Sequence, residues 1–391
     1  MRILIVGLST RAIAESAVDG GYDVMTLDYF GDRDQRALVP NVALQRDFDL
    51  PFSAEALLET SKRLDYDAVA YTSSLENHPE VVSELARGRR LLGNTPDVLN
   101  AVRDWATLRA VCDEEEIPHP TTLLPGEEGD ADETRRWLRK PTRGGGGHGV
   151  RPWEGERLDE DAVLQRMVIG RPASAAFVAD GRRSVVIGLS EQLIGREELG
   201  GEGYMWCGNI LPLPTRSTSQ LDAVLQTVER AAGRLTRRFG LRGVNGIDFV
   251  VADGPEDWPR PILVEVNPRY TASMELADWA YDLSAFDLHI RSFEGYLPRF
   301  SPREALRDAR FRAKGIVYAK KDGTVPSTAN WRHRGRRDIP FSGEKIQAGH
   351  PICTVVASGE TRETCWQRLV ERAEEVHRKM GPGEGERGDD R

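Results

Sequence analysis

Two acidic residues and an asparagine in the second half of the chain have the types and the spacing of metal ligands. Asp248 lies in the apolar run GIDFVVA, and Glu265 and Asn267 lie in the run ILVEVN. The intervening DGPEDWPRP is rich in turn-forming residues, so Val244–Tyr270 is predicted to form a β-hairpin. With the loop centred in the hairpin, Asp248 lies opposite Glu265. Asn267 points to the same side as Glu265, because side chains alternate along a strand.

This pair of opposed carboxylates needs a positive charge. Two carboxylates ~4 Å apart repel by about 1 kcal/mol in water and by about 4 kcal/mol at an effective dielectric constant of 20. The two apolar runs contain no lysine or arginine, so a bound divalent cation is the natural neutraliser. Hard oxygen ligands suit Mg²⁺ (or Mn²⁺), which usually shares its coordination shell with phosphates. The alternative is that both acids lie on a solvated face of the hairpin.

A second candidate site is the stretch WLRKPTRGGGGHGVRPW, in which Lys140 precedes a run of glycines. Such a run cannot build a core, and its backbone is costly to order. It suits a mobile flap whose bare N–H groups wrap an anion, phosphate above all, with the lysine as a compact phosphate ligand. The P-loop pattern is absent, and the alternative is a flexible surface loop. The glycines are Gly144, Gly145, Gly146, Gly147 and Gly149.

The composition limits the class of protein. With 391 residues, 39% hydrophobic and 29% charged, the chain suits a soluble globular protein of two or three domains. The formal charge of -9 argues against a nucleic-acid or anionic-membrane partner. No apolar run approaches the ~20 residues of a membrane span, and no secretion signal opens the chain. The four scattered cysteines fit reduced thiols, so we expect a cytoplasmic protein.

The first thirty residues, MRILIVGLSTRAIAESAVDGGYDVMTLDYF, predict a strand, a helix and a second strand that ends at Asp28. The loop lacks the GxGxxG glycines, which disfavours NAD binding. In sheets of this kind ligands bind beyond the carboxyl ends of the strands. Ser9 and Thr10 after the first strand, and Glu76 and Asn77 after the third, are therefore pocket candidates by position.

Taken together, the K-P-x₂-glycine-rich loop, the strand acid and the sequence EVNPR, in this order and at this spacing, resemble the ATP-grasp superfamily, in particular its biotin-carboxylase-like and carboxylate–amine ligase branch. The resemblance covers nearly the whole chain. It implies a mixed α/β and α+β fold with an N-terminal Rossmann-like domain (1–110) and an ATP-grasp body with antiparallel sheets (111–304). A small β-rich C-terminal domain (305–380) and a disordered tail (381–391) are expected to follow.

The resemblance also implies roles for residues that bind the nucleotide. Lys140 is expected to hold the α- and β-phosphates, and the glycines to close over them. Arg103 falls where many members carry a second phosphate-binding lysine. The adenine is expected near the strand end that follows the flap, where Arg166 replaces the family's usual acid. The residues expected there are Gln165, Met167 and Val168.

The same resemblance implies the chemistry. Asp248, Glu265 and Asn267 match the metal ligands, and Arg269 matches the residue that steadies an acyl phosphate, so Arg269 and Lys140 are the expected catalytic residues. ATP would phosphorylate a small-molecule carboxylate, and an amine would displace the phosphate to form an amide. The sequences ENHP and NPRYTASMEL look closest to a set of predicted ATP-dependent carboligases. Many relatives dimerise, so a homodimer is a possible assembly.

Three other functions remain open at this stage. A carboxylase that activates bicarbonate is one, although YTASMEL after Arg269 lacks the Val-Glu-His trio of biotin carboxylases. A non-catalytic nucleotide-binding protein is another, which the intact set of acids, asparagine and arginine disfavours. The last is an NAD(P)-dependent oxidoreductase, which the missing glycines disfavour.

Overall fold

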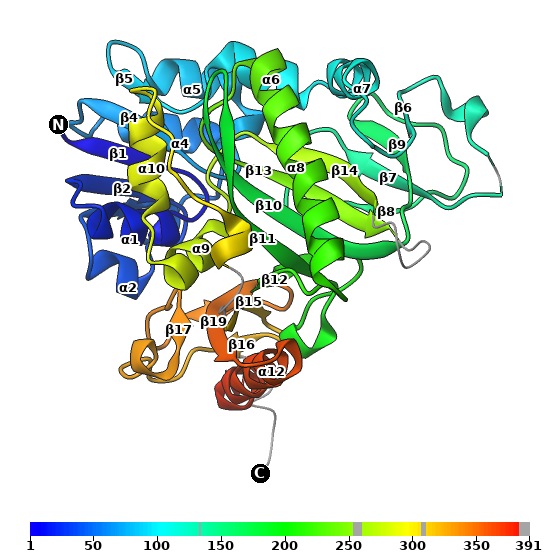
Figure 1. The fold of residues 1–391 in the computed structure, drawn as a ribbon. Coiled ribbons are helices and arrows are strands. Elements are labelled where there is room, and N and C mark those ends of the chain that lie inside the picture. Colours follow the sequence, from blue (N-terminus) through cyan, green and yellow to red (C-terminus); the bar gives the residue numbers. More distant parts are fainter. Residues whose placement is uncertain (133, 253–259, 306–309, 383–391) are drawn as a thin grey trace.

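The computed structural model describes residues 1–132, 134–252, 260–305 and 310–382, and Figure 1 shows the arrangement of its elements. The tip of the predicted hairpin loop, 253–259, and most of the predicted disordered tail, 383–391, lie outside the described residues. The first two residues of that predicted tail lie within the described part of the chain. Strand β20 (Gly381–Pro382) pairs with β16 (Gly323–Thr324).

The N-terminal part forms a parallel sheet with the strand order β3-β2-β1-β4-β5. The strands are β1 (Ile3–Val6), β2 (Val24–Asp28), β3 (Asn41–Ala43), β4 (Ala68–Tyr71) and β5 (Arg90–Leu92). All four residues of β1 are buried. Ile3 and Ile5 join one apolar cluster, and Leu4 and Val6 join another, as alternation of side chains requires when helices cover both faces. This is the predicted Rossmann-like arrangement.

Seven α-helices accompany this part of the chain. They are α1 (Arg11–Asp19), α2 (Arg33–Arg36), α3 (Leu44–Phe48), α4 (Ala54–Ser61), α5 (Pro79–Leu85), α6 (Pro96–Arg103) and α7 (Trp105–Glu114). A short 3₁₀ turn, η1 (Leu75–Asn77), lies between β4 and α5. It places polar side chains beyond the carboxyl end of β4, as the sequence predicts.

A separate antiparallel sheet follows, with the strand order β6-β9-β7-β8. Its strands are β6 (Thr122–Leu123), β7 (Trp137–Pro141), β8 (Arg151–Pro152) and β9 (Ala162–Arg166). It has its own small apolar cluster, which includes Trp137 and Leu164. In Figure 1 it forms the projection at the right, away from the N-terminal sheet.

The largest sheet has eight strands in the order β14-β13-β10-β11-β12-β15-β19-β17. The strands are β10 (Gly170–Asp180), β11 (Ser184–Ile194), β12 (Trp206–Leu211), β13 (Arg242–Ala252), β14 (Arg260–Asn267), β15 (Phe311–Tyr318), β17 (Arg336–Arg337) and β19 (Pro351–Gly359). Helix α8 (Thr218–Phe239) packs its apolar face, including Val228 and Leu235, against this sheet. Ser217 caps its N-terminus and Gly240 ends it in the left-handed conformation.

This sheet continues without a break from the central body into the C-terminal part. Strand β15 pairs directly with β12, from Gly208 opposite Gly315 to Leu211 opposite Arg312. The remaining elements are α9 (Met274–Tyr281), α10 (Ala285–Ser292), α11 (Pro302–Ala305), β18 (Lys345–Ile346) and α12 (Arg362–Lys379). The predicted fold class is confirmed, and the domain boundaries at 110/111 and 304/305 stay a prediction.

Buried ion pairs tie the three parts of the chain together. Arg11 of α1 pairs with Glu275 of α9, and its Nε lies 2.9 Å from Oδ1 of Asp338. Lys314 of β15 also pairs with Glu275. Arg11 and Lys314 have side chains only 1% and 4% exposed, so removing one partner would leave a buried charge and cost about 3–5 kcal/mol. Among the described helices, none combines the length and the apolar character that a bilayer span needs.

Candidate active site

The predicted hairpin is present and has the predicted register. Strands β13 and β14 are antiparallel, and Asp248 lies directly opposite Glu265. A bulge follows this pair, because the next match along the ladder is Phe249 with Leu263. Asn267 donates from Nδ2 to Oδ2 of Asp248 over 3.0 Å. The three expected metal ligands are therefore neighbours on one face of the hairpin.

One expectation about this pair needs correction. The hairpin sequence suggests a bound cation as the natural neutraliser of the two acids, but Arg103 at the end of α6 already neutralises them in part. Its Nη1 lies 2.6 Å from Oε1 of Glu265, and both side chains are largely buried, at 12% and 24% exposed. Its Nε donates to Oδ1 of Asn77 over 3.0 Å. Arg103 thus links the N-terminal sheet to the metal-ligand candidates.

The two acids differ in their electrostatic environment. Burial, and then the neighbouring Glu265 carboxylate, raise the pKa of Asp248 to about 7. Burial also acts to raise the pKa of Glu265, but Arg103 and Lys140 outweigh it, so the net shift is downward. At neutral pH Glu265 is therefore charged, and Asp248 is close to half protonated. A cation that bound between them would displace a proton from Asp248.

Lys140 lies at the end of β7, where the sequence predicts it, and its ammonium points into the same cluster. Its Nζ donates to Oε1 of Gln165 over 3.1 Å and lies 5.1 Å from the centre of the Trp105 ring. Burial lowers the pKa of Lys140, although the charge of Glu265 opposes this shift. Lys140 and Gln165 come from adjacent strands of the four-stranded sheet, so one sheet supplies both.

The residues around the expected adenine position differ in exposure. Gln165 is buried and donates from Nε2 to Oγ1 of Thr122 over 3.2 Å, whereas Arg166 is exposed. Met167 and Val168, beyond the end of β9, are half-buried. Arg166 thus turns away from the side occupied by Gln165, as strand alternation requires.

The glycine-rich loop packs against the site through its backbone. The carbonyl of Gly144 accepts from Nη2 of Arg103 and from Nδ2 of Asn77, each over 3.4 Å. The carbonyl of Gly146 accepts from the backbone N–H of Trp206 over 2.8 Å. Gly147 has φ +77°, and a Cβ there would lie 1.9 Å from the carbonyl oxygen of Tyr204. The close approach of two backbones explains why glycine is needed at this position.

Arg269, the expected catalytic arginine, is held from two sides. Its Nε lies 2.6 Å from Oε1 of Glu76, and its Nη2 donates to Oδ1 of Asn267 over 3.2 Å. Oε2 of Glu76 is buried and has no hydrogen-bond partner in the described part of the chain. The sequence places Glu76 near the pocket by strand position, but no local signal predicts its ion pair with Arg269. Gln192 of β11, which acts to lower the pKa of Asp248, is also missed by sequence reasoning.

These side chains come from two sheets, from helix α6 and from the turn η1, and they converge at one place. A family comparison covers most of them. Residues 104–273 match the model of the ATP-grasp domain. The chain contains an ATP-grasp domain. This range includes Lys140, Asp248, Glu265 and Arg269, and it begins one residue after Arg103. The predicted family resemblance is therefore confirmed.

Comparisons over the whole chain find one similar sequence and several similar folds. The chain is 22% identical over 404 aligned positions to an uncharacterized protein of Methanocaldococcus jannaschii, covering 97% of this chain and 94% of that protein. Its fold is similar to the biotin carboxylase domain of 2-oxoglutarate carboxylase from Hydrogenobacter thermophilus, solved with MgADP, ADP and bicarbonate (14% identity, TM-score 0.70, 97% and 90% covered). It is also similar to N5-carboxyaminoimidazole ribonucleotide synthetase from Thermotoga maritima (14% identity, TM-score 0.66, 97% and 98% covered). At this identity the two solved structures establish the fold alone.

Proposed function

We propose that the protein is an ATP- and magnesium-dependent ligase that activates a carboxylate as an acyl phosphate for attack by an amine. The observation that carries the proposal is the facing pair Asp248 and Glu265 on the ladder of an ATP-grasp domain. Two basic side chains, Arg103 and Lys140, lie close enough to this pair to lower the pKa of Glu265. Acidic metal ligands beside phosphate-binding cations are what a metal–nucleotide complex requires.

The donor atoms fit a hard divalent cation. Asp248 and Glu265 offer carboxylate oxygens and Asn267 offers an amide oxygen, which are the ligand types that Mg²⁺ and Mn²⁺ prefer. At these positions the paired strands β13 and β14 carry two acids and no lysine or arginine. A bound Mg²⁺ would supply charge neutralisation for the nucleotide phosphates and for the phosphoryl group in transfer.

The chain's own residues would do the rest by position and charge. Lys140 would exchange its bond with Gln165 for phosphate oxygens of ATP. Arg103 would turn its Nη groups, now on Glu265 and on the Gly144 carbonyl, toward the same phosphates. The glycine loop would exclude water from them with bare N–H groups. No covalent bond to the enzyme is needed, so alignment and electrostatic stabilisation supply the rate enhancement.

Arg269 would stabilise the activated carboxylate. Glu76 and Asn267 fix the plane of its guanidinium, which favours bidentate contact with a carboxylate or an acyl phosphate. In the reaction, a carboxylate oxygen attacks the γ-phosphorus and ADP leaves. The amine nitrogen then attacks the carbonyl carbon, phosphate leaves, and the amine loses a proton, which gives the amide.

A carboxylase that uses bicarbonate is the second candidate. It is favoured by the fold shared with the two carboxylating enzymes above. Bicarbonate would take the place of the carboxylate beside Arg269, and the same phosphoryl transfer would give carboxyphosphate. The two candidates therefore differ in the substrates that trigger ADP release.

The test is ADP release by the purified protein with panels of amines and carboxylates. We expect release only when both substrate classes are present, whereas release with bicarbonate in place of the carboxylate would favour the carboxylase. Asp248→Asn and Glu265→Gln should each abolish release while the thermal midpoint is retained. Glu191→Gln is the matched control, because Glu191 is a partly buried acid of the same sheet that pairs instead with Arg362. Full activity in an Asp248→Asn, Glu265→Gln double variant would refute the metal assignment.

A further inference from the structure

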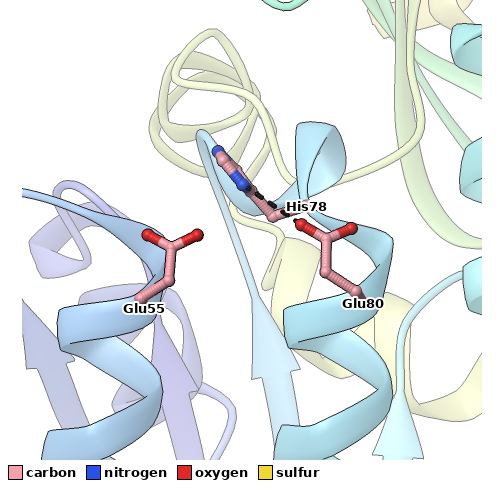
Figure 2. Close-up of side chains that lie close together, drawn as sticks. All are labelled: Glu55, His78 and Glu80. Atoms are coloured by element: carbon pink, nitrogen blue, oxygen red, sulfur yellow. Dashed lines mark ion pairs between the residues drawn. The ribbon is translucent and has the colours of Figure 1, made fainter.

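A second group of metal-ligand side chains lies in the N-terminal part, outside the site described above. Glu55 lies in the first turn of α4, and His78 and Glu80 lie at the start of α5. Each side chain offers one ligand atom, and these three atoms lie within 4.8 Å of one another. Figure 2 shows the two carboxylates on neighbouring helices, with the imidazole ring of His78 beside them.

The charges in this group are unbalanced. Nδ1 of His78 lies 3.5 Å from Oε1 of Glu80, and this is the one ion-pair contact among the three residues. Within the described ranges, neither Glu55 nor Glu80 has a lysine or arginine in ion-pair contact. Two carboxylates and a ring nitrogen thus face one point, with at most one proton to compensate two negative charges.

The backbone that carries His78 is held firmly. Asn77 accepts from Nε of Arg103, and Glu76 pairs with Arg269 over 2.6 Å. The N–H of His78 donates to the carbonyl of Leu75 over 3.0 Å, and Pro79 begins α5 directly after it. The imidazole is therefore presented from a segment already fixed by the active-site arginines.

We propose that Glu55, His78 and Glu80 bind one divalent transition-metal ion of the zinc type. An imidazole nitrogen with two carboxylate oxygens suits Zn²⁺, whereas Mg²⁺ prefers oxygen alone. Zinc–ligand bonds of about 2.0–2.2 Å place tetrahedral ligand atoms about 3.3–3.6 Å apart. Both glutamates are exposed, so the three side chains need only small rotations to reach that spacing. Three protein ligands leave the fourth position to water or a small molecule.

The test is metal binding by tag-free, nucleotide-free protein in saturating Mg²⁺, which occupies oxygen-only sites. Zn²⁺ is titrated by calorimetry, and Co²⁺ is titrated by its visible absorption as a ligand-sensitive substitute. We expect one saturable site, with affinity lowered on the order of tenfold or more in His78→Ala, Glu55→Gln and Glu80→Gln. His333→Ala is the control, because His333 is an exposed histidine that lies elsewhere in the chain.

Two results would overturn the proposal. One is the absence of saturable Zn²⁺ and Co²⁺ binding by the wild-type protein. The other is binding that survives His78→Ala unchanged, or that is lost instead in Glu265→Gln, which would place the ion at the proposed magnesium site. Metal binding that is retained in Glu265→Gln and lost in His78→Ala supports the proposal. Because the readout is metal binding, it is independent of ligase activity.

Discussion

Replacing Arg103 by methionine should strengthen metal binding by the nucleotide-free protein while weakening ATP binding. The guanidinium of Arg103 lies 2.6 Å from Oε1 of Glu265 and competes with any cation for that carboxylate. Methionine keeps an unbranched side chain of similar length and removes the charge. The opposite signs of the two effects distinguish this model from a general loss of structure, which would weaken both.

The size of the effect follows from the geometry. At ~4 Å and an effective dielectric constant of 20, two unit charges attract by about 4 kcal/mol. The pair is partly exposed, at 12% and 24%, and Lys140 still acts on Glu265 in the variant, so only part of this energy is released. We expect about 1.4–2.8 kcal/mol, which is about tenfold to a hundredfold tighter Mn²⁺ binding.

Mn²⁺ binding should be measured by electron paramagnetic resonance at pH 8, where Asp248, with its pKa of about 7, is mostly ionised. Arg109→Met is the matched control, because Arg109 of α7 forms an ion pair of the same 2.6 Å length with Glu127, which lies outside the helix. Its Mn²⁺ affinity should equal that of the wild type. Unchanged or weaker Mn²⁺ binding by a folded Arg103→Met variant would refute the competition between Arg103 and the metal.

Two further predictions concern the acid pair and the glycine loop. Below its pKa of about 7, Asp248 carries a proton that must leave before a metal binds. The apparent Mn²⁺ dissociation constant of the wild type should therefore be about tenfold larger at pH 6 than at pH 8. A dissociation constant that does not change with pH in the same resonance titration would contradict this pKa. Gly147→Ala should raise the KM for ATP about tenfold, because the new methyl group would collide with the Tyr204 carbonyl at a residue of positive φ. Gly145→Ala is its control, since a Cβ there meets open space, and equal steady-state kinetics of the two variants would show that the packing of the loop is immaterial.

The features that the sequence predicts correctly depend on short-range patterns. The register of Asp248 with Glu265 follows from the position of a turn-rich loop between two apolar runs, and the ladder has that register. Lys140 at a strand end before the glycines, and the parallel N-terminal sheet, follow from strand alternation and buried apolar runs in the same way. These features require only that neighbouring residues obey the period of one element.

The contacts that the sequence does not predict join residues far apart in the chain. Arg103 and Glu265 are 162 positions apart, and Arg269 and Glu76 are 193 apart. Neither pair has a local pattern, because each depends on how whole elements pack. The same reason applies to the pairing of β12 with β15, because the sequence of a strand does not specify which strand it pairs with.

The site is divided between two sheets, and this division has a mechanical consequence. Lys140, Gln165 and the glycine run belong to the four-stranded sheet, whereas Asp248 and Glu265 belong to the eight-stranded sheet. Two connections, residues 115–121 and 167–169, link the smaller sheet to its neighbours along the chain. A rotation about these two connections would move Lys140, Gln165 and the glycine run together as one rigid body. Asp248 and Glu265 would stay in place on the eight-stranded sheet, whose surroundings are braced by the buried ion pairs of Arg11. A metal–nucleotide complex, with its phosphates on Lys140 and its metal ion on the two acids, would then draw the two sheets together.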